Sequence, residues 1–183
     1  IYDVTIGVIG AGFAGRHYIK LLQNFEVNIL LYDPYIAEEK AAELGAKKVE
    51  LDTLLKESDV VSIHAPFLPS TYKMINRERL QIMKDNAILI NTARGAIIDE
   101  GAIIEELRKG RIFACLDVTD PEPPSRDHPF RRLPNVILTP HLAGCAANRK
   151  KKIGKFVVEE LKRYLNVEPL LGEVKAEQLQ IIA

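Results

Sequence analysis

The stretch VTIGVIGAGFAG, residues 4–15, decides the fold expected for this chain. Residues 4–9 are an apolar, β-branched run that predicts a strand, and a helical pattern follows over residues 14–24. The glycines between them have G-x-G-x-x-G spacing, which allows a tight turn and lets the backbone approach a pyrophosphate at a helix N-terminus. The cofactor-binding residues expected in this turn are Gly10, Gly12, Phe13, Ala14 and Gly15.

An acidic residue follows the second predicted strand at the distance expected for a dinucleotide-binding domain. Asp33 comes directly after the run NILLY, close to the spacing of about 20 residues found for a ribose-binding acid. A carboxylate there accepts hydrogen bonds from the ribose hydroxyls and repels a 2′-phosphate, which favours NAD over NADP. Two alternatives stay open: a glycine-rich turn with an incidental Asp, and an Arg16 that is either a pyrophosphate contact or a solvated helix residue.

Short apolar runs alternate with amphipathic helical stretches along most of the chain. Continuous apolar runs are typical of parallel strands that are covered on both faces, so the pattern predicts an α/β fold with a doubly wound parallel sheet. The Pro-rich segment 120–135 is expected to be a functional loop, because long loops in compact domains are functional or disordered. Strands are expected at 4–9, 26–32, 47–50, 59–65, 86–91, 111–117 and 135–139, and helices near 14–24, 36–44, 51–57, 77–83, 99–109 and 146–165.

The composition excludes several classes of function. The 183 residues have a formal net charge of +0, which argues against nucleic acid or an anionic membrane surface as the main partner. No apolar run approaches the roughly 20 residues that span a bilayer. The two cysteines, Cys115 and Cys145, lack metal-ligand spacing, and a reducing, cytoplasmic setting is expected. Cys115 is expected to be buried, and His17 and His128 are expected at the surface.

Polar side chains follow the later predicted strands. His64 follows the fourth strand, Arg94 the fifth, Asp117 and Glu122 the sixth, and His141 the seventh. The carboxyl ends of parallel strands converge on one crevice, so we expect these groups near a bound nicotinamide. An arginine binds a carboxylate in bidentate fashion, and a histidine oriented by a carboxylate transfers protons near neutral pH. This set suits the reduction of a 2-oxo acid to a 2-hydroxy acid.

Five motifs taken together resemble the D-isomer-specific 2-hydroxy-acid dehydrogenases: GAGFAG, YDPY, NTARGAIIDE, LDVTDPEP and LTPHLAG. The resemblance implies that Arg94 holds the substrate carboxylate and 2-oxo group, and that His141 is the acid/base residue. It further implies that Glu122 is the carboxylate paired with His141. For the cofactor, it implies that Asp33 binds the ribose and Asp117 the nicotinamide carboxamide, with Ala93 and His64 also on the cofactor-binding side.

The chain departs from the family pattern in several places. The segment IFACLDV is one residue shorter than usual, VTDPEP lacks an aromatic after the valine, and HLAGCAANRKKK lacks acidic residues. These changes bear on the identity of the substrate more than on the type of reaction. A formate-dehydrogenase-like function is disfavoured because that group is expected to carry a glutamine at the position of Glu122.

Members of the family also carry a substrate-binding domain of roughly 100 residues. The chain begins with Ile1, directly before the first predicted strand at 4–9, so residues 1–165 are expected to be the NAD-binding domain of a longer protein. Residues 166–183 are expected to be a tail that returns to the second domain. A homodimer is expected, since this domain forms the dimer contact in the family. The alternative function is an NAD(H)-sensing binding module of the corepressor type with little turnover.

Overall fold

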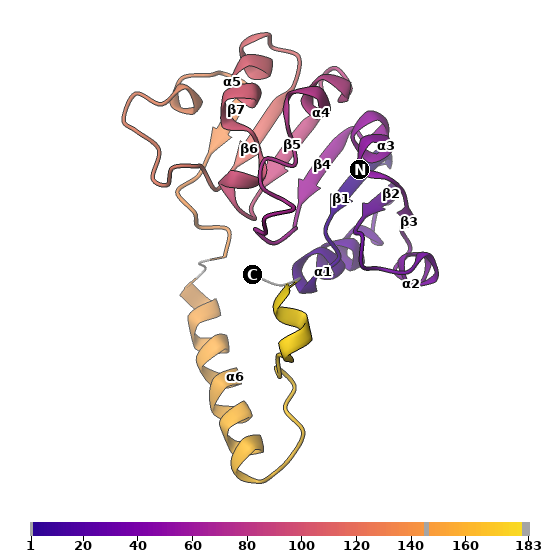
Figure 1. Ribbon diagram of the computed structural model, residues 1–183, viewed down its shortest axis with the longest axis vertical. Helices are drawn as coiled ribbons and strands as arrows, with labels where there is room; N and C mark the ends of the chain where they lie inside the picture. The colour runs from indigo at the N-terminus through magenta and orange to yellow at the C-terminus, as the bar shows by residue number, and fades with distance from the viewer. Residues whose placement is uncertain (1, 145–146, 181–183) are drawn as a thin grey trace. The chain divides into compact units, whose positions relative to one another are not determined.

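A computed structural model describes residues 2–144 and 147–180 of the chain. The chain divides into two compact units, Ile1–Pro140 and His141–Ala183. The first unit holds the sheet and the second holds one long helix followed by a short one (Figure 1). None of the helices in the described part of the chain is long and apolar enough to cross a membrane.

The first unit is built on a seven-stranded parallel sheet, which confirms the predicted α/β fold. Its strand order is β3-β2-β1-β4-β5-β6-β7. The chain moves outward from β1 to β3 and then crosses back to β4 on the other side of β1. The carboxyl ends of β1 and β4 therefore flank the switch point, where ligands of such sheets bind. The strands are β1 (Tyr2–Ile9), β2 (Glu26–Tyr32), β3 (Lys47–Lys48), β4 (Val60–Ile63), β5 (Ile88–Asn91), β6 (Phe113–Leu116) and β7 (Val136–Leu138).

Two separate apolar cores lie on the two faces of this sheet. One contains Ile19, Leu31 and their neighbours and packs α1 and α2 against β1 and β2. The other packs α3, α4 and α5 over the opposite face around residues such as Leu54 and Leu89. Because β1 and β2 are buried on both faces, their sequences read as continuous apolar runs. The helices are α1 (Phe13–Leu22), α2 (Glu38–Glu43), α3 (Leu51–Glu57), α4 (Arg77–Ile82) and α5 (Glu100–Arg108).

One half of the α1-side face is open within the first unit. Ile88 pairs with Phe113, and Cys115 pairs with Ile137, so these side chains share one face of β5, β6 and β7. Phe113 is 44% exposed and Ile137 is 64% exposed. The expectation that Cys115 is buried is therefore wrong. Its thiol is free and half-buried, because no described element of the first unit covers this part of the sheet.

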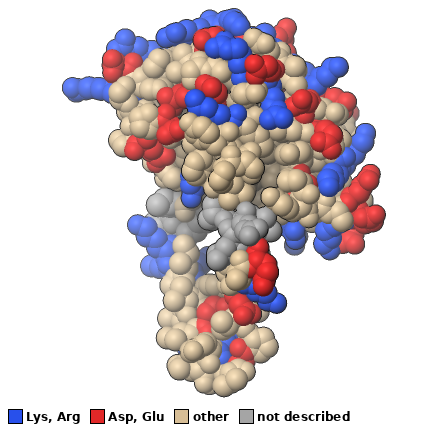
Figure 2. Space-filling model, in the orientation of Figure 1, with Lys and Arg blue, Asp and Glu red and all other residues tan. Residues whose placement is uncertain are grey.

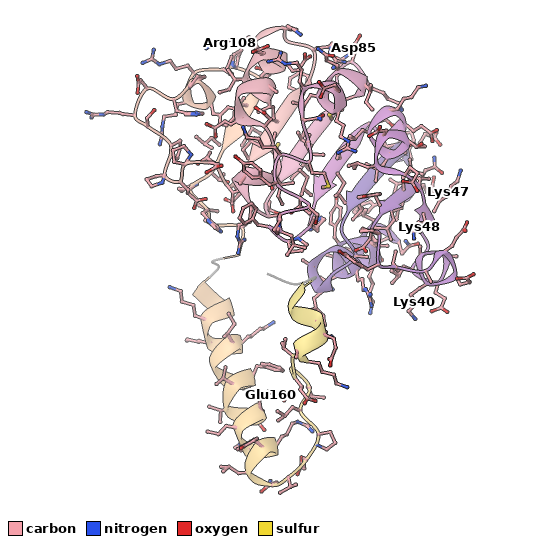
Figure 3. All side chains as sticks on the ribbon, in the orientation of Figure 1. Lys40, Lys47, Lys48, Asp85, Arg108 and Glu160 are labelled. Atoms are coloured by element: carbon pink, nitrogen blue, oxygen red, sulfur yellow. The ribbon has the colours of Figure 1, made fainter. Side chains whose placement is uncertain are left out.

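The second unit contains α6 (Ala147–Leu165) and the 3-10 helix η3 (Ala176–Gln180). The carboxylate of Glu160, labelled in Figure 3, accepts hydrogen bonds from the backbone N–H groups of Leu171 (3.2 Å) and Gly172 (2.7 Å). These bonds hold the segment after α6 beside the helix. The apolar tail residues Ile181 and Ile182 lie outside the described residues. The functional division at residue 165 stays a prediction.

Candidate functional site

The three glycines of the first turn meet very different surroundings. Gly10 has φ +98°, and a Cβ there would lie 2.7 Å from the backbone nitrogen of Ala65. A Cβ on Gly15 would lie 2.0 Å from the carbonyl oxygen of Gly10. A Cβ on Gly12, in contrast, would meet nothing within 4 Å. Gly10 and Gly15 are thus required by packing, whereas Gly12 faces open space at the switch point.

Gly12 is also the N-cap of α1, with extended backbone and no side-chain capping bond. The next two residues, Phe13 and Ala14, are exposed, and Phe13 is 97% exposed. The first N–H groups of a helix need acceptors, and an anion satisfies them together with the helix dipole. Arg16 does not point freely into this space, because its Nε donates to the carbonyl oxygen of Ala11 at 2.6 Å. The turn is therefore suited to a pyrophosphate that is bound by backbone groups.

Asp33 is joined to the glycine turn by hydrogen bonds. Its Oδ2 accepts a hydrogen bond from the backbone N–H of Ala11 at 2.6 Å, and its Oδ1 accepts one from the N–H of Tyr35 at 2.8 Å. The carboxylate is half-buried, and each of its oxygens keeps a second acceptor position. Asp33 consequently helps to shape the turn and also presents acceptors beside it, which suits a ribose diol. The first of these roles was missed at the level of sequence.

His64 packs against the glycine turn, since a Cβ on Gly15 would lie 3.4 Å from the Cβ of His64. Its Nε2 is 2.9 Å from the Ser62 hydroxyl, and its ring centroid is 5.0 Å from that of Tyr18. Burial lowers the pKa of His64 to about 4, so the ring is neutral near pH 7. These contacts favour a structural or cofactor-binding role for His64, as its expected place on the cofactor-binding side implies, over a role in proton transfer.

The buried His64 gives the stability of this chain a pH dependence. Below about pH 6.5 the unfolded chain binds a proton at this ring, but the folded chain does so only near pH 4. The free energy of unfolding should therefore fall through this window, by up to about 3 kcal/mol. Urea unfolding of the wild type and of His64→Gln at about pH 7 and about pH 5 measures the effect. The variant should lose less stability between the two pH values, and equal losses would contradict the assignment.

The turn that carries Arg94 is organised by a buried amide. Asn91 has no exposed surface; its Nδ2 donates to the carbonyl oxygen of Arg94 at 2.8 Å, and its Oδ1 accepts from the N–H of Ala93 at 3.0 Å. The guanidinium of Arg94 is exposed, with Nη1 bonded to the carbonyl oxygen of Ala93 at 2.7 Å. Asn91 thus holds the backbone while the cationic end of Arg94 reaches solvent. Sequence reasoning did not assign a role to Asn91, although its place directly before Thr92 and Arg94 is a signal for one.

Asp117 is held at the end of β6. It is 4% exposed, and its Oδ1 accepts a hydrogen bond from the Thr139 hydroxyl at 2.5 Å. Its backbone N–H donates to the carbonyl oxygen of Asn91 at 3.0 Å, so it extends the ladder between β5 and β6. A buried carboxylate with a fixed orientation suits recognition of a polar group, such as a carboxamide, at the sheet edge.

The loop after β6 carries the exposed Glu122 and contains the 3-10 helix η2 (Pro129–Arg131). The expectation that His128 lies at the surface is wrong, because this residue is only 9% exposed. Its Nε2 is 2.9 Å from Glu100 Oε1, and its ring packs 4.6 Å from the ring of Phe130. His17, by contrast, is exposed as expected.

The structure places all nine predicted cofactor residues in the first unit, at strand ends, in the adjoining turns or in the first turn of α1. Arg94 and Glu122 also lie in this unit. His141 begins the second unit, where it is exposed and has φ 49°. Acidic and basic side chains are interspersed over the visible face (Figure 2), in line with the net charge of +0. Among the described residues, no cluster of three His, Cys, Asp or Glu side chains is placed to hold a metal ion.

A family model and individual relatives of this chain point to the same group of proteins. The model of the family "D-isomer specific 2-hydroxyacid dehydrogenase, NAD binding domain" matches residues 1–143. The chain is 37% identical over 177 residues to a D-3-phosphoglycerate dehydrogenase of Archaeoglobus fulgidus, covering 96% of the chain and 34% of that protein. It is 40% identical over 162 residues to a glyoxylate reductase of Korarchaeum cryptofilum, covering 88% and 49%.

A solved structure gives the same picture for the fold. The crystal structure of D-lactate dehydrogenase with NAD+ from Lactobacillus jensenii matches with a TM-score of 0.82 and 32% identity, over 95% of this chain and 56% of that one. The chain therefore spans about a third to a half of the length of these proteins.

Proposed function

This chain belongs to the D-isomer specific 2-hydroxyacid dehydrogenase family, as its NAD-binding domain, and on that basis we propose that it serves an NAD-dependent dehydrogenase. The proposed reaction interconverts a small 2-oxo acid and a D-2-hydroxy acid. The matched relatives are named for substrates of this kind, including glyoxylate and D-3-phosphoglycerate. The natural protein is proposed to be a homodimer in the cytoplasm. The Cys115 thiol, which is half-buried and not in a disulfide, fits a reducing compartment of this kind.

The observation that carries the proposal is the contrast among the glycines. Backbone atoms pack closely against Gly10 and Gly15, but Gly12 faces open space at the N-terminus of α1. Beside this space Asp33 offers acceptors for a ribose, and Ala93 and His64 belong to the turns after β5 and β4. These residues fit a dinucleotide, whose nicotinamide supplies the hydride when it is bound. Gly10, Gly12, Phe13, Ala14 and Gly15 would hold the pyrophosphate, and Asp117 would bind the carboxamide.

The remaining groups are assigned to the substrate. Arg94 would bind its carboxylate, because an exposed guanidinium on a backbone held by Asn91 offers a rigid pair of donors. Proton transfer at the 2-oxo or 2-hydroxy oxygen is assigned to His141, and Glu122 is assigned as its paired carboxylate. Turnover separates this proposal from an NAD(H)-sensing module, which would bind the cofactor with little rate.

A fluorescence titration of this chain with NADH and NADPH tests the cofactor assignment. We expect NADH to bind more tightly than NADPH, because the carboxylate of Asp33 repels a 2′-phosphate. Asp33→Asn keeps one acceptor oxygen but removes the charge, so it should weaken NADH binding by about 10-fold or more and narrow the difference from NADPH.

The matched control is Asp52→Asn, since Asp52 is an exposed acid of α3 whose Oδ1 pairs with Arg79. This change should leave both affinities unchanged. Equal binding of NADH and NADPH by the wild type would contradict the role of Asp33, and binding of neither would contradict the assignment of the turn.

A further inference from the structure

The carboxylate of Glu100, at the start of α5, bridges two distant parts of the loop after β6. Its Oε1 is 2.9 Å from His128 Nε2, and its Oε2 accepts a hydrogen bond from the backbone N–H of Asp120 at 3.2 Å. The side chain of His128 is 10% exposed and that of Glu100 is 23% exposed, so the contact between these two side chains is largely shielded from water. One carboxylate therefore ties both ends of the segment that carries Glu122.

The hydrogen bonds also define the tautomer of His128. The backbone N–H of Phe130 donates to His128 Nδ1 at 3.3 Å, which makes Nδ1 an acceptor. In a neutral imidazole the other nitrogen then carries the proton, so Nε2–H donates to Glu100. The ring thus caps η2 with one nitrogen and holds Glu100 with the other.

The same loop is packed directly against the Arg94 turn. A Cβ on Gly95 would lie 2.1 Å from the carbonyl carbon of Thr119, so the two backbones touch at this point. The Thr119 hydroxyl in turn donates to the carbonyl oxygen of Pro121 at 2.9 Å, one residue before Glu122. A small cavity lined by Asn91, Gly95, Glu100, Val118 and Phe130 marks the junction of the turn, the helix and the loop.

We propose that Glu100 and His128 are positioning residues that set the place of Glu122 relative to Arg94. This inference rests on the proposed function, in which Arg94 binds the substrate carboxylate and Glu122 supports proton transfer. Glu122 itself is exposed on the Pro-rich loop and lies between Asp120 and His128, the two points at which Glu100 holds this loop. A misplacement of about 1 Å costs on the order of 100-fold in rate, which makes such a pair important although neither member touches the substrate.

Substitutions at His128 separate its two hydrogen bonds. His128→Asn places an acceptor where Nδ1 lies and keeps the cap on Phe130, but it loses the donor to Glu100. His128→Gln reaches Glu100 with its amide and weakens the cap. We therefore expect His128→Asn to lower kcat while its free energy of unfolding stays near that of the wild type. His128→Gln should retain more of the wild-type kcat but have a lower free energy of unfolding. The reverse order would overturn the proposal.

A double-mutant cycle tests whether Glu100 acts through Glu122. In the longest natural protein that contains this chain, Glu100→Ala should lower kcat by about 10- to 100-fold with little change in the affinity for NADH. In a Glu122→Gln background the same change should cost less than about 3-fold, because the group that it positions is already inactive. Amide hydrogen exchange of residues 119–131 should rise in Glu100→Ala, which gives a readout that does not depend on turnover.

Glu105→Ala is the matched control, since Glu105 is an exposed acid of the same helix that pairs with Arg77. It should change neither kcat nor the exchange of the loop. Equal costs of Glu100→Ala in both backgrounds would overturn the positioning role alone. If instead Glu122→Gln leaves turnover unchanged, or the wild type turns over no 2-oxo acid, the proposed function fails and the positioning role fails with it.

Discussion

Gly12→Ala is expected to yield a folded chain that no longer binds NADH. The residue has φ −70°, which any L-residue adopts, and its new methyl group would meet no protein atom within 4 Å. The same methyl group would occupy the space assigned to the pyrophosphate, where a backbone approach requires the absence of a side chain. We expect an affinity loss of 100-fold or more, on the order of 3 kcal/mol. Circular dichroism with urea unfolding measures the fold, and a fluorescence titration measures the affinity.

Gly15→Ala is the matched contrast, because its methyl group would lie 2.0 Å from the Gly10 carbonyl oxygen. Since that neighbour is backbone, α1 would have to move away from β1, and we expect a loss of stability of about 3 kcal/mol or more. Gly110→Ala controls for backbone strain alone, as it has φ +71° and open space. It should cost about 1 kcal/mol and leave NADH affinity unchanged. Wild-type affinity in Gly12→Ala would mean that the cofactor binds elsewhere.

The second large effect is expected at Arg94. Arg94→Ala should lower kcat/KM for a 2-oxo acid by about 100- to 1,000-fold, because a bound carboxylate would lose its bidentate cation. NADH affinity should stay within about 2-fold of the wild type, since the side chain of Arg94 is assigned to the substrate and not to the cofactor. Steady-state kinetics on the longest natural protein that contains this chain give the first quantity, and titration of this chain gives the second.

Arg94→Lys separates charge from geometry. A lysine keeps the positive charge but lacks the planar fork, so it should recover only part of the lost rate. Arg108→Ala is the control, as Arg108 is a charged residue at the end of α5 and is labelled in Figure 3. It should leave kcat/KM unchanged. Full activity of Arg94→Ala would remove the carboxylate-binding role from this residue.

Much of the architecture follows from local patterns in the chain. Apolar runs such as residues 26–32 mark strands that are buried on both faces, and the structure has β2 at Glu26–Tyr32. The helix expected at 51–57 is likewise α3. The glycine spacing and the acid after β2 predicted a dinucleotide site, because each of these features depends on backbone conformation within a short segment.

Other features depend on contacts between residues that are distant in sequence. His128 looked like a polar residue in a surface loop, yet it is buried: Glu100, 28 residues away, accepts a hydrogen bond from its ring, and Phe130 packs against it. Asp33 reaches 22 residues back to hold Ala11. No periodicity or motif encodes such pairs.

The chain by itself thus determined the order of strands and helices, the glycine turn and the residues that carry polar groups at the strand ends. Only the tertiary structure decided which glycine faces open space and which is packed against backbone, because that depends on how closely β1, β4 and α1 approach one another. It likewise decided that Asn91, Glu100 and His128 hold the turn of Arg94 and the loop of Glu122. The physical reason is that a hydrogen bond forms wherever folding brings a donor and an acceptor within about 3 Å, whatever their separation along the chain.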